Sequence, residues 1–382
     1  MQFFKIPKFQ IISFFRCFSA TSLKMEITNF RKNPLSIEGH NSIIISQSYD
    51  IFQNLALENW LYTSCDFSTS NISVLLMWFN EPSVVIGRHQ NPWIECAVKF
   101  CETNGINIAR RNSGGGTVYH DLGNLNLSFL TSRKDYNRKR NLELVCNSIN
   151  KRWCINLNIS KRHDILYNDQ YKVSGTASKL GRKNAYHHCT VLVDVDEAKL
   201  HQALHRKLES IESKATSSIR AEVINLKSLC SDIDTAKVIE AITSYYKQVY
   251  EVQDDHVFYI NPNENVFPGI NQIQEELKSW DWCFGHTPRF TITKSFQIKA
   301  KNPVVNVEIL MSINKGKIEN ISLDPQILKS ESYNTLKQCI INNPFSILID
   351  NSLTAWMHHS DDKMVCQIVK HNILQMILGV LR

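Results

Sequence analysis

A polar loop with three consecutive glycines carries the residues best suited to hold an anionic ligand. It reads RRNSGGGTVYHD over Arg110–Asp121. Glycine has no Cβ, so three in a row let backbone N–H groups approach a bound molecule closely. Two arginines, Arg110 and Arg111, precede the glycines, and a guanidinium matches phosphate or carboxylate oxygens in planar, bidentate fashion. The loop therefore predicts a site for an anionic small molecule, with a flexible turn as the alternative reading.

The residues after the glycines exclude the common phosphate-binding loops. Apolar Leu125, Leu127 and Phe129 alternate with polar residues, and a period of two indicates a strand, so the loop joins two strands. The chain contains neither GxxxxGK[ST] nor a GxGxxG that opens a helix. A nucleotide held by this loop would therefore not sit on a helix N-terminus.

Lys172 is the side chain best suited to take part directly in a reaction. It lies in YKVSGTA, Tyr171–Ala177, where alternation puts Lys172 and Ser174 on the face opposite Tyr171 and Val173. A compact ammonium can hold a carbonyl oxygen and a phosphate oxygen together. The alternative is a solvated surface lysine, but the small and apolar neighbours favour a packed sheet.

The run His187-His188-Cys189 contains residue types that bind metals, but their spacing argues against a metal site. Adjacent strand residues point to opposite faces, and no second ligand group lies at zinc spacing, so no metal centre is predicted. Cys189 as a nucleophile would need a positioned base; His187 shares its face by alternation, which keeps this minor alternative open. Eleven cysteines without a CxxC pair indicate a reducing compartment and thiols that mostly fill the core.

The elements that position these groups fall into two sets. Continuous apolar runs at 74–79 and 83–87 predict buried strands. Helices are expected at 51–62, 93–104, 141–150 and 236–250, and strands at 106–111, 162–167, 171–177 and 186–195. After a polar stretch at 254–265, the pattern predicts strands at 289–299, 304–313 and 317–323, with helices at 332–342 and from 364. We therefore expect an α/β (α+β) protein with a catalytic domain over 42–253 and a small α+β accessory domain over 264–382.

Composition limits the classes of partner. The 382 residues are 43% hydrophobic and 21% charged, as in an ordinary globular protein. A net charge of +7 suits anionic small ligands or acidic protein partners. No aromatic-interleaved basic stripe and no apolar run of membrane-spanning length occur, so neither nucleic acid nor a membrane is predicted.

The first 25 residues have the composition of a targeting segment. They contain Lys5, Lys8, Arg16 and Lys24, and no acid precedes Glu26. This predicts a mitochondrial presequence over 1–25 and a location in the matrix, with a secretory signal as the rival.

Several segments in order resemble the signature segments of the lipoate–protein ligase A family. They are Arg110–Asp121, Tyr171–Ala177 and Tyr186–Leu192 (YHHCTVL), extended by Gly87–Trp93 (GRHQNPW), Asn261–Ile270 and Trp280–Arg289. The likeness covers about residues 45 to 345, and the mitochondrial lipoyltransferases of animals are the nearest branch. It implies a catalytic domain of the kind shared with biotin ligases, a small accessory domain, and lipoyl-AMP as the bound substrate.

The resemblance also implies roles for individual residues. Lys172 matches the catalytic lysine that grips both acyl carbonyl and phosphate. The residues implied to contact lipoyl-AMP are Arg111, Ser113, Gly114, Gly115, Gly116, Thr117, Tyr119, Arg162, Asp164, Lys172, Thr190 and, with weaker alignment, Thr216 and Ser218.

Three functions stay open at this point. The first is a lipoyltransferase that moves lipoyl from lipoyl-AMP, or from a carrier protein, onto a lysine of 2-oxoacid dehydrogenase E2 lipoyl domains. The second is a full lipoate–protein ligase that also uses ATP and magnesium, and the third a non-catalytic lipoyl-nucleotide carrier. Family likeness favours the transferase, working as a monomer without a tightly bound cofactor, with the glycine cleavage H protein as a further partner.

Overall fold

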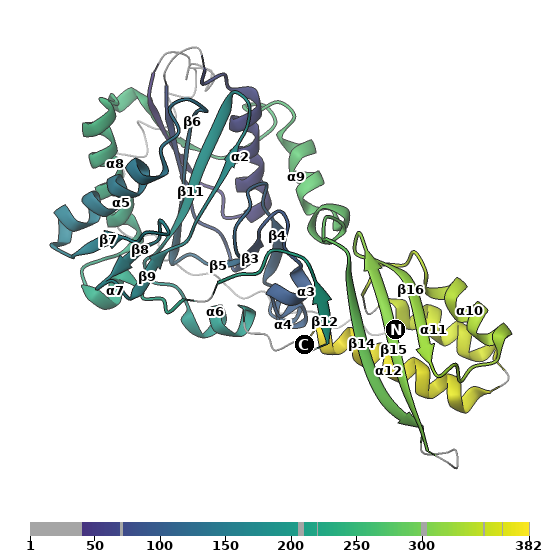
Figure 1. Cartoon of the computed structure of the whole chain (residues 1–382). Helices are drawn as coiled ribbons and strands as arrows, with labels where there is room; N and C mark the ends of the chain where they lie inside the picture. Colours follow the sequence, from purple (N-terminus) through teal and green to yellow (C-terminus); the bar gives the residue numbers. More distant parts are fainter. Residues whose placement is uncertain are drawn as a thin grey trace, which may run out of the picture.

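The computed structural model describes residues 40–68, 72–204, 210–219, 221–298, 304–346, 348–360 and 362–381. The predicted presequence at 1–25 lies outside these residues. A larger α/β unit stands beside a smaller α+β unit (Figure 1), so the predicted fold class is confirmed.

A six-stranded mixed sheet forms the centre of the larger unit. Its order is β10 (Thr176–Leu180), β11 (Asn184–Leu192), β6 (Asn124–Ser132), β2 (Val74–Trp78), β1 (Ser42–Ser46) and β13 (Val257–Ile260). The first four strands pair antiparallel, and β1 pairs parallel with both β2 and β13. All residues of β1, β2 and β6 are buried, which explains the near-continuous apolar runs of β1 and β2.

The period of two in β6 separates two buried faces rather than a buried and an exposed one. Leu125, Leu127 and Phe129 pack in one hydrophobic core. The polar residues between them face the other side of the sheet, where Asn126 borders a cavity. The sequence pattern thus distinguishes the side of the sheet that packs in the core from the side that borders the cavity.

Helices cover both faces of the large sheet. On one face, α5 (Arg138–Trp153) and α8 (Thr235–Tyr250) pack on each other and on the apolar side of β6. On the other face lie α2 (Ile51–Ser64), α9 (Ile270–Lys278) and a three-stranded sheet of order β4 (Asn107–Arg110), β3 (Ser83–Ile86) and β5 (Val118–His120). A further small sheet joins β7 (Leu157–Ile159), β8 (Ile165–Tyr167) and β9 (Tyr171–Ser174).

The helix expected at 93–104 is interrupted. The structure has α3 (Pro92–Glu95) and α4 (Val98–Thr103), separated by extended backbone at Cys96. Ala97 N–H donates to Ala203 O of α6 (Glu197–Leu204) at 2.8 Å. This hydrogen bond between distant segments stabilises the backbone where the helix is interrupted. No local sequence pattern predicts it.

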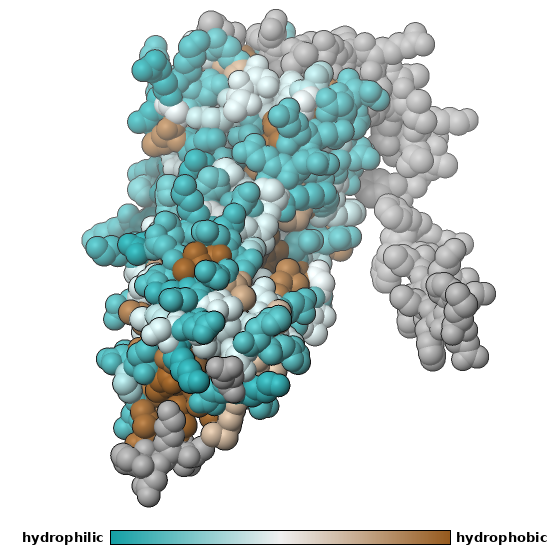
Figure 2. All heavy atoms as spheres, turned by 90° about the vertical axis from the view of Figure 1, so that its right-hand side faces the viewer, coloured by the Kyte–Doolittle hydropathy of each residue, from teal (hydrophilic) through white to brown (hydrophobic). Residues whose placement is uncertain are grey.

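The smaller unit is a four-stranded sheet covered on one face by helices. Its order is β12 (Ile211–Ser213), β14 (Phe290–Ile298), β15 (Val305–Asn314) and β16 (Lys317–Asp324). The helices are α10 (Ser330–Ile340), α11 (Ile349–His358) and α12 (Lys363–Leu381) (Figure 1). The face seen in Figure 2 is mainly hydrophilic, with apolar side chains in small separate patches. Of the helices in the described part of the chain, none is long and apolar enough to cross a membrane.

Strand pairing does not follow the expected boundaries at 253 and 264. Strand β13 lies between them and completes the large sheet, whereas β12 comes from inside 42–253 and pairs with β14 of the small sheet (Figure 1). One hydrophobic core also contains Trp93 of α3 together with Phe290 and Phe345. The two units are therefore joined by sheet pairing and by a shared core, which patterns read along the chain do not reveal.

Candidate functional site

The glycine loop turns sharply between β4 and β5. Gly115 has φ +86°, a conformation that favours glycine. Gly87, at the end of β3, lies against it so closely that a Cβ there would stand 2.1 Å from Gly115 O. Two glycines from different parts of the chain thus allow the loop to fold onto β3.

Arg110 is fully buried and is bonded to protein oxygens on every side. Its side chain donates to the carbonyls of Gly87, Arg88 and Gln90 at 2.9–3.2 Å. It also donates to the carbonyls of Trp282 and Cys283 and to Thr287 Oγ1. The expectation that both arginines of the loop meet an anionic ligand is therefore wrong for Arg110, which ties the loop to the short π-helix η4 (Asp281–Gly285).

Arg111 supports the loop from inside. Nε donates to Ser113 Oγ, one terminal nitrogen to Val85 O, and the other to Gly114 O and Gly116 O, both at 2.6 Å. Burial lowers the pKa of Arg111 to about 10, so the guanidinium stays charged at neutral pH. Four of its N–H groups hold the protein's own oxygens, although the side chain still borders the cavity.

A buried acid and a histidine stand behind Ser113. His188 Nε2 lies 2.8 Å from Ser113 Oγ, and His188 Nδ1 lies 2.9 Å from Glu58 Oε1 on α2. Burial alone would raise the pKa of Glu58, but the attraction and hydrogen bond of His188 outweigh it, and the pKa lies below its usual range. A continuous hydrogen-bonded chain thus runs from Glu58 through His188 and Ser113 to Arg111.

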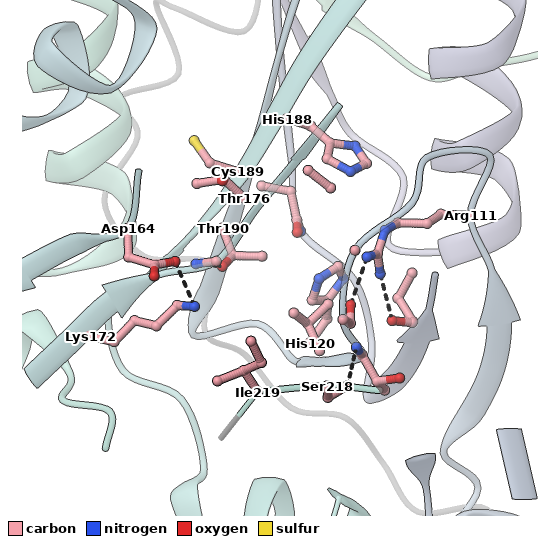
Figure 3. A pocket seen from close by; sticks show the side chains of 18 of the residues that line it. Arg111, His120, Asp164, Lys172, Thr176, His188, Cys189, Thr190, Ser218 and Ile219 are labelled. Carbon is pink, nitrogen blue, oxygen red and sulfur yellow. Dashed lines mark hydrogen bonds and ion pairs between the residues drawn. The ribbon is translucent and has the colours of Figure 1, made fainter. Parts of the chain in front are cut away.

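Lys172 lies across the pocket from this loop (Figure 3). Its Nζ is 2.7 Å from Asp164 Oδ1, and both side chains are about a fifth exposed, 23% and 21%. Both backbone groups of Lys172 are bonded to one neighbouring segment, because its N–H donates to Glu222 O and its carbonyl accepts from Ile224 N–H. The ammonium is thus fixed at its base and paired with one carboxylate, and it faces open space.

Thr190 lies on β11, close to Lys172 of β9, and forms two hydrogen bonds with Gly175. Gly175 N–H donates to Thr190 Oγ1 and Thr190 N–H donates to Gly175 O, both at 2.9 Å. This pairing fixes the corner where β9 ends and β10 begins.

The segment 216–219 closes the pocket on a third side (Figure 3). Ser218 Oγ accepts from Thr117 N–H at 2.9 Å and from Gln90 Nε2 at 3.0 Å, and it donates to Glu95. Thr216 N–H donates to His89 O at 3.3 Å. Because β12 directly precedes this segment and pairs with β14, the small sheet anchors one wall of the pocket.

Two cavities meet beside Lys172. The first has a volume of about 330 Å³ and the second about 560 Å³. Both are bordered by Lys172, Gly175, Thr190, Thr117 and Ser218. A ligand with two parts could therefore place one in each cavity, with the junction at Lys172.

Most of the residues predicted for the site surround the first cavity. Those that border it are Arg111, Gly115, Gly116, Thr117, Arg162, Asp164, Lys172, Thr190, Thr216 and Ser218. Tyr119 borders the second cavity with a buried hydroxyl that lacks a partner among the described residues. Ser113 and Gly114 border neither cavity. Within the loop, Ser113 Oγ and Gly114 O accept hydrogen bonds from Arg111.

The structure adds residues that sequence reasoning missed. Gln90 and Glu95 hold Ser218, and Glu58 and His188 hold Ser113. Gln90 lies inside the GRHQNPW motif, which could have identified it as a residue of the site. Glu58 sits in a helix 130 residues from His188, so only the fold brings the two together.

The minor readings of the His187–Cys189 run lose support. Burial raises the pKa of the Cys189 thiol to about 12 and lowers that of His187 well below its usual range, which disfavours a thiolate and a general base. Among the residues that the structure describes, no group of three or more His, Cys, Asp or Glu side chains is placed to hold a metal ion.

Comparisons with known proteins show the family to which the chain belongs. A family model described as the lipoyl protein ligase A/B catalytic domain matches residues 50–247. The chain is 40% identical over 307 residues to a human protein named mitochondrial lipoyl amidotransferase, covering 79% of this chain and 82% of that protein. The mouse counterpart is 39% identical over 302 residues, covering 78% and 79%.

Solved structures show the same fold. A structure of P. falciparum LipL1 in complex with lipoate is 28% identical, with a TM-score of 0.57, and covers 88% of this chain and 99% of that one. A putative lipoate protein ligase from T. acidophilum with bound lipoic acid gives a TM-score of 0.53 at 21% identity, over 64% of this chain and 99% of that chain.

Proposed function

This chain belongs to the lipoate–protein ligase family and is a mitochondrial lipoyltransferase, and we propose that its acyl donor is lipoyl-AMP. In this proposal the lipoyl group passes to one lysine of a lipoyl domain in a 2-oxoacid dehydrogenase E2 subunit. The observation that carries it is the position of Lys172 at the junction of two cavities. An acyl-adenylate has two parts of different chemistry joined at one anhydride, which is the group that Lys172 would contact.

In this proposal the first cavity is the slot that receives the acyl chain. Thr190, Asn126 and Trp78 are cross-strand neighbours on β11, β6 and β2, and all three border it. Neighbouring strands lie about 4.8 Å apart, so this floor runs roughly 10 Å away from the Lys172 side. Leu55 and Val85 also border the slot, which gives it apolar walls for a medium-length acyl group.

The second cavity then receives the nucleotide. Tyr119 and Asn124 border it, each with a buried polar atom that lacks a partner among the described residues. Leu192, Leu200 and Leu204 supply apolar surface. Unpaired polar atoms beside apolar walls suit a planar base with hydrogen-bonding edges.

The chain's own residues supply positioning and charge rather than a nucleophile. The acceptor amine forms a bond to the acyl carbon, the bond from that carbon to the phosphate oxygen breaks, and AMP leaves with the electron pair. Lys172 Nζ stabilises the negative charge that builds on the carbonyl oxygen. The acceptor lysine, with an ordinary pKa near roughly 10.4, must lose a proton, for which Asp164 and the departing phosphate are the two candidates.

A cationic rim supports docking of an acidic acceptor protein. Arg138 and Arg162 border the first cavity, and the first turn of α5 carries Arg138, Lys139 and Arg140 with no acid. Cations at a helix N-terminus oppose the helix dipole, and an acidic surface around the acceptor lysine would offset that cost. Lipoyl domains of E2 subunits are the proposed acceptors, with the glycine cleavage H protein as a second carrier.

The test separates the transferase from the full ligase and from a silent carrier. Purified protein is incubated with an apo-lipoyl domain in two mixtures, one with lipoyl-AMP and one with lipoate, ATP and magnesium. The mass of the domain is then measured by mass spectrometry. A domain whose acceptor lysine is replaced by arginine is the control. We expect modification with lipoyl-AMP. Modification in both mixtures would make the protein a full ligase, and binding of lipoyl-AMP without any modification would make it a carrier.

A further inference from the structure

One polar atom in the acyl slot has no partner. Among the residues that border the first cavity, His120 is the described one with a buried side-chain nitrogen, Nε2, that makes no hydrogen bond. His120 is 5% exposed. An unpaired buried polar atom carries an uncompensated desolvation cost, so a ligand group that pairs with it would be favoured.

His120 lies at the end of the slot away from Lys172. It stands on the Arg111 side of the pocket, with Lys172 opposite (Figure 3). Its Nδ1 contacts the amide of Asn80, two residues beyond Trp78, which ends the floor of the slot. If the acyl carbonyl lies at Lys172, the terminal part of the acyl group reaches His120.

The contacts of the Asn80 amide assign the proton of the His120 ring. Trp78 Nε1 can only donate, so the Asn80 amide atom 3.3 Å from it is the oxygen. In this orientation the same oxygen lies 2.9 Å from His120 Nδ1, and Nδ1 is the nitrogen that donates to it. Burial, with help from the charge of Arg111, lowers the pKa of His120 to about 3, so the ring is neutral. Its Nε2 then carries a lone pair that no described residue satisfies.

A lone pair at this place distinguishes two forms of the same acyl group. The oxidised dithiolane ring has no hydrogen-bond donor, whereas the reduced dithiol has two S–H groups, which are weak donors. We infer that the slot is built for the reduced, dithiol-bearing acyl group, with one S–H donating to His120 Nε2. This inference rests on the proposed function and names the form of the substrate that the site prefers.

The experiment compares three adenylates that differ only at the far end of the acyl chain. Transfer to an apo-lipoyl domain is measured as kcat/KM with dihydrolipoyl-AMP kept reduced by a phosphine, with lipoyl-AMP without reductant, and with octanoyl-AMP under both conditions as the control for the reductant. We expect the dithiol form to exceed both others by about fivefold, the size of one modest hydrogen bond. His120→Phe should bring the three values close together, and His120→Gln, which keeps an acceptor oxygen, should retain part of the preference.

The ratios are taken within each variant, so a general loss of activity does not imitate the predicted change. Thermal melting reports whether each variant folds. Equal transfer of the three adenylates by the wild type, or a fivefold preference that survives His120→Phe, would overturn the inference and leave the proposed function standing. Failure of the wild type to use any adenylate would instead reject the proposed function.

Discussion

The arginine pair of the glycine loop and Lys172 are both cationic, yet they differ in what their charges contact. Arg110 and Arg111 direct their N–H groups to backbone carbonyls and hydroxyls of the protein. Lys172 has one carboxylate partner and borders both cavities. The first region uses charge to hold a shape, and the second keeps its charge available for a ligand.

This difference shows why residue type alone does not identify a ligand contact. A guanidinium has five donors in a fixed fork, which suits a loop whose carbonyls converge from several segments. An ammonium is a compact point charge, and one carboxylate partner leaves donors for an acyl oxygen and a phosphate. The comparison predicts that variants of the arginines change stability, whereas variants around Lys172 change transfer.

The largest effect on folding is expected for Arg110→Met. Removing the guanidinium leaves several buried carbonyls without a donor, at about 1–3 kcal/mol for each. We expect the free energy of unfolding to fall by on the order of 3 kcal/mol or more, measured by chemical denaturation. Arg133→Met, at an exposed position, is the control and should change little. Equal stability of the two variants would break the comparison.

A smaller effect, on transfer instead of folding, is expected for Asp164→Asn. The change keeps the shape but removes the charge that orients Lys172 Nζ. A hydrogen bond between charged groups contributes about 1.5–3 kcal/mol, and partial exposure reduces this, so transfer should slow by roughly tenfold. Asp169→Asn, in the turn of the same hairpin, is the matched control, since asparagine tolerates the positive φ of 59° found there. A loss of stability with unchanged transfer would place Asp164 among the structural residues.

The smallest effect is expected at Cys189. With its pKa raised to about 12 by burial, only on the order of one thiol in 10⁴ is ionised at pH 8. Iodoacetamide should therefore modify the exposed Cys154 and leave Cys189 untouched, with transfer unchanged. Peptide mass spectrometry after timed labelling checks this. Labelling of Cys189 as fast as Cys154, together with loss of transfer, would revive the nucleophile reading.

Local patterns predicted the parts of the site that depend on neighbouring residues. Three glycines and the period of two located the loop and its strands, and the alternation around Lys172 placed it in a sheet. The pairing of Glu58 with His188 and the hold of Gln90 on Ser218 depend on how distant segments meet. The pairing of β12 with β14 of the small sheet could not be predicted either, because the sequence of one strand does not determine which strand it pairs with.

The most direct test of the account compares Lys172→Ala with the wild type in transfer from lipoyl-AMP to an apo-lipoyl domain, beside thermal melting of both. Losing a donor that stabilises a developing oxyanion costs about 2.7–4 kcal/mol, or 10²–10³ in rate. We predict a loss of that size with an unchanged melting temperature, a similar loss for Lys172→Arg, and near-normal transfer for the exposed control Lys161→Ala. Near-normal transfer by Lys172→Ala would contradict the account.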